Sequence, residues 1–156
     1  MKQFLRAFSR VALTGWLLGV LAPSVVQAQD SPTPSWTTLA QVSFEKVYNE
    51  LLGLKVDQPV FSENVKNLDG QRVTLRGYVI PTEGYRSHKE FVFSAYPYSM
   101  CFFCGGAGPE SVVEVFASEP IEYSAEAIVI TGTLRLNSVD PNALMYRLED
   151  AEMIEG

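Results

Sequence analysis

Five short segments in the second half of the chain alternate apolar and polar residues, the pattern of β strands with one buried face. The alternation is clearest just after the turn signal Asp69-Gly70. The predicted strands are Val73 to Ile80, Glu90 to Tyr96, Ser111 to Phe116, Ala127 to Leu136, and Leu144 to about Ile154. Because no long helical pattern separates these segments, the sequence predicts a mainly β protein.

The number of predicted strands suits a small closed barrel. The oligonucleotide/oligosaccharide-binding (OB) barrel has five strands, and Gly132 inside the fourth segment indicates a bulge or a close approach of two backbones. Residues 70–78 follow the pattern Gly-x-x-Val-x-Leu-x-Gly-Tyr, which is similar to a strand of that fold. We therefore expect a five-stranded OB-like barrel with one N-terminal α-helix. A five-stranded open sheet or a partial sandwich is the alternative.

The predicted helix lies before the strands, from Ser43 to Gly53. Ser43 is a good N-cap, and Gly53 is a good residue to end a helix. Between them, apolar residues recur at helical spacing and form one stripe: Phe44, Val47, Tyr48, Leu51 and Leu52. We expect this stripe to cap the barrel, and the following segment, Val60 to Asp69, to be irregular.

The first 28 residues have the composition of a secretory signal peptide. They contain three cations and no acid, with an apolar stretch before a predicted cleavage site after Ala28. A transmembrane anchor is the alternative, but a span needs about 20 apolar residues and Gly, Thr and Pro interrupt this stretch. We expect a mature protein that is periplasmic or secreted and has no membrane span.

After the signal peptide we expect a lead-in over residues 29–35 and a single domain over residues 36–156. Of the 156 residues, 47% are apolar and 19% are charged, a balance that suits one globular domain. After residue 28 there are nine Lys or Arg and 18 Asp or Glu, a net charge of -9. Because such an acidic protein is repelled by phosphate, we expect no nucleic-acid partner.

Both cysteines lie in the long connection between the second and third predicted strands. Cys101 and Cys104 are two residues apart, and glycines follow directly. Two thiolates at this spacing can bind one metal ion, and glycine lets the backbone turn tightly around the ion. The candidate ligands are Cys101, Cys104, Glu110 and His88.

A closed zinc site needs four ligands, so two copies of the chain would have to contribute two thiolates each. Soft Cu(I) also suits thiolates, and Met100 adds a thioether. His88 precedes the second strand whereas the cysteines follow it, a separation of roughly 23 Å at about 3.3 Å per residue. Under this hypothesis the cofactor is Zn or Cu, and the protein is a monomer or a homodimer.

Two other hypotheses explain the same cysteines. A structural disulfide would hold a local turn, and Phe102 and Phe103 would then form an interaction loop that docks an envelope protein such as a transporter. A thiol–disulfide oxidoreductase would place the first cysteine at a helix N-terminus, but the glycines after Cys104 begin a helix poorly. With one histidine and no nucleophile or phosphate-binding motif, we expect no enzyme.

Residues 68–81 and 91–114 resemble a family of exported bacterial proteins known only as a domain of unknown function. The resemblance implies an OB-like fold, a signal peptide and association with ABC-type export or metal-uptake genes, and no established activity. Many members have one Cys followed closely by His and a Pro-rich run in this loop. This chain instead has Cys104, glycines and no nearby His. We therefore expect an uncharacterised exported accessory protein that binds a metal ion through the C-x-x-C loop.

Overall fold

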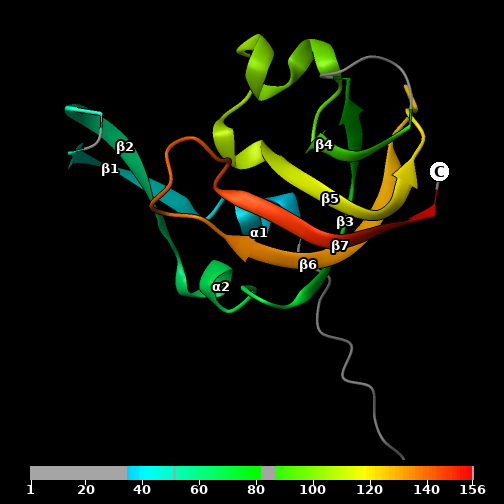
Figure 1. The fold of residues 1–156 in the computed structure, drawn as a ribbon, viewed down its shortest axis with the longest axis horizontal. Coiled ribbons are helices and arrows are strands. Elements are labelled where there is room, and N and C mark those ends of the chain that lie inside the picture. Colours follow the sequence, from blue (N-terminus) through cyan, green and yellow to red (C-terminus); the bar gives the residue numbers. More distant parts are fainter. Residues whose placement is uncertain (1–34, 51, 82–86, 156) are drawn as a thin grey trace, which may run out of the picture.

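A closed β barrel forms the centre of the computed structural model, which describes residues 35–50, 52–81 and 87–155 (Figure 1). The barrel strands are β3 (Arg72–Ile80), β4 (His88–Ser94), β5 (Val112–Ile121), β6 (Ile128–Leu136) and β7 (Tyr146–Glu155). Each strand overlaps one of the five predicted segments. The predicted mainly β, five-stranded barrel is therefore confirmed.

The barrel strands follow the order β3-β4-β5-β7-β6, and β6 pairs back onto β3. All neighbours are antiparallel except β5 and β7, which are parallel. Five strands in this order form a barrel of the OB type. Because every barrel strand has two neighbours, the alternative of an open sheet is excluded.

The core is formed by alternate side chains that point into the barrel. In β3, Val73, Leu75 and Val79 are buried, and the residues between them at 74, 76 and 78 are exposed or half-buried. Phe91 and Phe93 bring aromatic rings into the core from β4. A shift of one residue would expose this whole apolar set, so burial of one face determines the strand register.

Gly132 lies at a close approach between β6 and β7. A Cβ atom at this position would lie 2.7 Å from the Cγ atom of Leu148 and 2.9 Å from the carbonyl oxygen of Glu149. The register of the pair shifts here, and Asp150 in β7 has a φ angle of 49°. The predicted close approach at this glycine is confirmed.

Two one-turn helices close one end of the barrel. They are α1 (Trp36–Leu39) and α2 (Glu63–Lys66), and each buries one apolar side chain, Leu39 and Val65 respectively. The indole nitrogen of Trp36 donates a hydrogen bond of 2.8 Å to the carbonyl oxygen of Arg76. An N-terminal helix is thus present, but it is shorter and earlier than expected. The segment predicted to be irregular contains α2 and the end of a strand.

The predicted helix from Ser43 to Gly53 is wrong. Its residues form β1 (Val42–Asn49), which pairs along its whole length with β2 (Leu54–Phe61) in an antiparallel hairpin. Val47 lies opposite Val56, and β-branched and aromatic residues favour such cross-strand pairs. The helical spacing predicted the wrong element because residues 54–61 pair with this segment across the turn at Gly53, and the spacing of apolar residues does not record such pairing.

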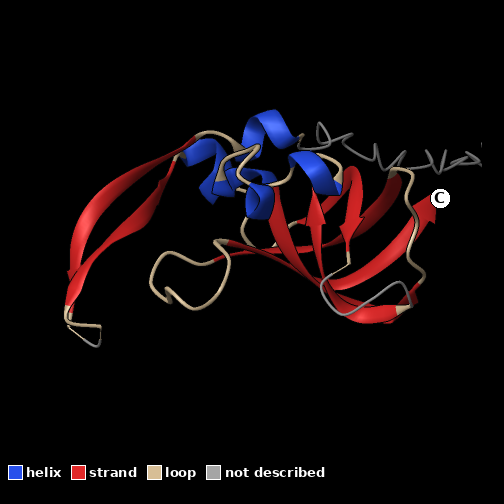
Figure 2. Cartoon of the chain, turned by 90° about the horizontal axis from the view of Figure 1, so that it is seen from above, coloured by secondary structure: helices blue, strands red, loops and turns tan. Residues whose placement is uncertain are grey.

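The hairpin extends away from the barrel, and the helical turns lie together on one side of the barrel (Figure 2). At its base, the ring of Phe61 packs 5.6 Å from the ring of Tyr146 in the core. The predicted signal peptide and most of the lead-in lie outside the described residues. Within the described ranges, no helix is long and apolar enough to cross a membrane.

Candidate interaction site

The connection between β4 and β5 is a folded loop with three short 3-10 turns. These are η1 (Tyr98–Met100), η2 (Phe102–Cys104) and η3 (Pro109–Ser111). The hydroxyl of Ser111 donates a hydrogen bond of 2.6 Å to the carbonyl oxygen of Gly108. The backbone N–H of Ala95 donates a hydrogen bond to the carbonyl oxygen of Ser111. The loop therefore has internal structure that holds its side chains in place.

Cys101 organises the centre of this loop. Its side chain is buried, and its carbonyl oxygen accepts hydrogen bonds from the backbone N–H groups of Cys104 at 3.1 Å and Gly106 at 3.2 Å. Gly105 has a φ angle of 76°, which favours glycine. A Cβ atom on Gly106 would lie 2.6 Å from the carbonyl oxygen of Met100. The glycines after the second cysteine thus permit a tight turn.

Both cysteines are free thiols, but their surroundings differ. Cys101 is buried and Cys104 is exposed. Desolvation raises the pKa of Cys104 above its ordinary value, and a hydrogen bond and electrostatic interaction with Cys101 raise it further. A raised pKa reduces the thiolate fraction at neutral pH, whereas a nucleophilic redox cysteine needs a lowered one. The raised pKa of Cys104 therefore does not favour thiol–disulfide exchange.

The two other candidate metal ligands lie apart from the thiols. His88 begins β4, and the cysteine loop follows the opposite end of that strand. The Glu110 carboxylate turns back over Gly108, where both its oxygens lie 2.3 Å from the position a Cβ atom would take. Within the described residues, no group of three or more His, Cys, Asp or Glu side chains could hold a metal ion.

Three large aromatic or apolar side chains of the loop are exposed. Tyr98, Met100 and Phe103 are 57%, 54% and 54% exposed, and we call these three residues the apolar tip. Phe102 is half-buried beside it, with its ring centroid 5.3 Å from that of Phe103. Of the two predicted interaction residues, Phe103 thus belongs to the tip and Phe102 points to a neighbouring groove.

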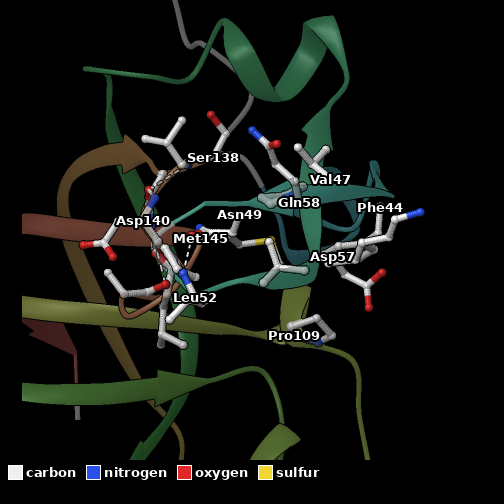
Figure 3. Close-up of a pocket in the computed structure, with 18 of the residues that line it drawn as sticks. Phe44, Val47, Asn49, Leu52, Asp57, Gln58, Pro109, Ser138, Asp140 and Met145 are labelled. Atoms are coloured by element: carbon white, nitrogen blue, oxygen red, sulfur yellow. Dashed lines mark hydrogen bonds between the residues drawn. The ribbon is translucent and has the colours of Figure 1, made fainter.

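The groove, of about 1110 Å³, runs between the β1–β2 hairpin and the loop over residues 137–145 (Figure 3). One wall carries Phe44 and Val47 from the hairpin, the opposite wall carries Ser138 and Asp140, and Met145 lies between them. Phe102 and Pro109 continue the lining toward the cysteine loop. The groove and the apolar tip are therefore neighbours joined by the Phe102–Phe103 pair.

Sequence reasoning missed the groove entirely. The spacing of the apolar residues predicts a helix where the hairpin wall lies, and residues 137–145 contain no motif that predicts a site. One signal was available, because the apolar Leu54 and Val56 alternate with the charged Lys55 and Asp57 directly after Gly53. That pattern predicts a strand that needs a partner, and the preceding residues are the nearest candidate.

The fold and the site define a five-stranded OB-type barrel with a projecting hairpin and an apolar loop. The chain is similar in structure to a DUF3299 family protein from Pseudomonas aeruginosa PAO1, at a TM-score of 0.44 and 22% identity. The match covers 58% of this chain and 66% of that one, just under two thirds of its length. That protein is described as a member of a family of unknown function. No family model and no curated protein matches the chain.

Proposed function

We propose that the protein is an exported interaction module of the cell envelope and that the apolar tip docks a partner protein. The observation that supports this proposal is the exposure of Tyr98, Met100 and Phe103, each more than half exposed, on one loop. Tyr, Phe and Met are enriched at the centres of protein interfaces, and apolar residues gathered on a surface mark interaction sites. The function is non-enzymatic.

The structure of the loop supports this role further. The buried Cys101 side chain and the tight contact of Gly106 with Met100 hold the tip in one conformation. A preorganised loop loses little conformational entropy when it binds, so more of its contact energy appears as affinity. A disulfide between Cys101 and Cys104 would strengthen the same turn without changing its role.

Photo-crosslinking in the cells that export the protein tests this proposal. A photoreactive phenylalanine at position 103 should yield one discrete protein adduct, and Tyr98→Ala should reduce the yield about tenfold if Tyr98 is a hot spot. The matched control is the same photoreactive residue at Ile154, which is 59% exposed and lies in β7. Equal adducts at positions 103 and 154, or none at 103, would overturn the proposal.

A soft metal ion at the thiol pair is a second candidate function. The two-residue spacing of Cys101 and Cys104 and the left-handed Gly105 after them support it. Two thiolates can hold Cu(I), with Met100 as an added thioether, whereas zinc would need the two thiolates of a second copy. The ion would then be held at the base of the apolar tip.

Native mass spectrometry of the mature protein with added Cu(I) or Zn²⁺ tests the metal candidate. A Cu(I) adduct on the monomer, or one zinc ion on a dimer, should appear and be lost in Cys104→Ser. Because Cys104 is exposed, this substitution does not disturb the core. Glu119→Gln is the matched surface control. A metal adduct that persists in Cys104→Ser would exclude the thiol site. The intact mass of the chain in the same sample tests whether the signal peptide is cleaved after Ala28.

A further inference from the structure

We propose that the groove between the β1–β2 hairpin and the 137–145 loop binds an extended, cationic and apolar segment of a partner polypeptide. The inference rests on the proposed interaction function and adds a second contact site and the partner's chemistry. It is independent of the cysteines, since neither thiol lines the groove.

The hairpin is the first reason. Among the described strands, β1 and β2 pair only with each other, and their sheet leaves Phe44 and Val47 each 40% exposed. Toward its end, Tyr48 and Leu54 are 59% and 52% exposed. A two-stranded hairpin is marginally stable in water unless a third strand or an apolar surface covers it. A bound segment would cover these exposed apolar side chains and so stabilise the hairpin.

The opposite wall is already formed. The side-chain amide of Asn137 donates to the carbonyl oxygens of Asp140 at 2.8 Å and Leu144 at 3.3 Å. Its oxygen accepts from the backbone N–H groups of Val139 and Asp140 at 3.1 and 2.9 Å. These bonds hold the loop in a shape that leaves Val139 78% exposed. The wall therefore presents an apolar side chain at little further entropic cost.

Charge decides what kind of segment fits. Glu50 of the hairpin and Asp140 of the 137–145 loop contribute carboxylates from opposite walls. Asp57, on the hairpin wall, is paired with Lys46 at 2.8 Å. Lys55 is the single cation among the residues that line the groove. Lys or Arg side chains on a bound segment would meet the carboxylates while its apolar residues face Val47. A second copy of this chain, itself strongly acidic, is disfavoured as the occupant.

The length of the hairpin sets the length of the segment. Strand β1 has eight residues, which span roughly 26 Å at about 3.3 Å per residue. A segment of similar length in extended conformation would contact the whole hairpin wall. A segment bound in the groove would contact Phe102, which lines it. The ring of Phe102 packs against that of Phe103, so the bound segment would lie next to the apolar tip.

Fluorescence anisotropy with synthetic peptides tests the inference. The probe is a labelled nine-residue peptide in which lysine alternates with valine or leucine, and glutamate replaces lysine in the control peptide. We expect the lysine peptide to bind at least about tenfold more tightly at low salt, and the difference to shrink as salt is added. Equal affinities for the two peptides, or no binding of either, would overturn the inference.

Matched variants of the protein locate the binding. Val139→Asn should weaken binding of the lysine peptide about fivefold or more, whereas Ile154→Asn, an exposed residue outside the groove, should leave it unchanged. The double variant Glu50→Gln/Asp140→Asn keeps the size of both side chains but replaces each charged carboxylate with a neutral amide. It should remove most of the preference for lysine over glutamate. An unchanged preference in this double variant would contradict the inference.

Phe103→Ala separates this inference from the proposed function. It removes an apolar-tip residue that does not line the groove, so affinity for the lysine peptide should stay at the wild-type value. If the peptide fails to bind while position 103 still crosslinks to a partner, the groove inference fails and the interaction module stands. If the peptide binds and position 103 yields no adduct, the groove inference stands and the proposed role of the apolar tip fails.

Discussion

At the scale of single residues, Tyr146 joins the barrel to the N-terminal segment. Its side chain is fully buried, and its hydroxyl donates a hydrogen bond of 2.5 Å to the carbonyl oxygen of Leu39. Burial first, and then the negative charge of Glu110, raise the pKa of Tyr146 well above its ordinary value. The folded protein therefore holds this proton to a higher pH than the unfolded chain does.

It follows that the contribution of Tyr146 to the free energy of unfolding is complete below about pH 10, the ordinary pKa of tyrosine, and is lost as pH rises above it. Tyr146→Phe should remove much of this alkaline loss. It should also cost about 1–3 kcal/mol at neutral pH, because the Leu39 carbonyl loses its donor. Urea unfolding at pH 7 and pH 11 measures both effects. An equal alkaline loss in Tyr146→Phe would contradict this assignment.

At the scale of elements, the hairpin and the barrel differ in what their apolar residues contribute. Leu75 in β3 is 1% exposed, whereas Leu54 in β2 is 52% exposed. Leu75→Ala should lower the free energy of unfolding by about 2–5 kcal/mol, because it leaves a cavity in the core. Leu54→Ala should change it by less than about 0.5 kcal/mol. Urea unfolding compares the pair, and a similar loss for both would mean that the hairpin packs on the barrel in solution.

At the scale of the whole molecule, closure of the barrel makes its five strands one cooperative unit. The hairpin is joined to this unit at its base, where Phe61 and Val42 pack against the core. Backbone amides of β1 and β2 should therefore exchange hydrogen through local opening, while those of β5 and β6 should exchange only through global unfolding. Hydrogen exchange followed by mass spectrometry measures this difference. Equal protection of both regions would show that the hairpin unfolds with the barrel.

The part of the fold that was predictable depended on a buried face. Period two in β3 and β6 and the crowding at Gly132 follow from burial in the barrel, and each leaves a pattern in neighbouring residues. The hairpin has exposed residues on both faces, so the apolar residues of β1 do not alternate as those of a strand with one buried face do. Phe44, Val47 and Tyr48 matched a helix by spacing alone, and only pairing with β2 shows that they form a strand.

The sequence by itself determined the five barrel strands, the place of the cysteine loop between two of them and the tight turn at its glycines, because these depend on neighbouring residues. The tertiary structure alone decided which strands are neighbours, that Cys101 is buried and Cys104 exposed, and that the hairpin stands opposite the 137–145 loop. Those features join residues such as Val47 and Asp140, which are far apart in the chain. Long-range packing and barrel closure bring them together, and no local pattern records such pairs.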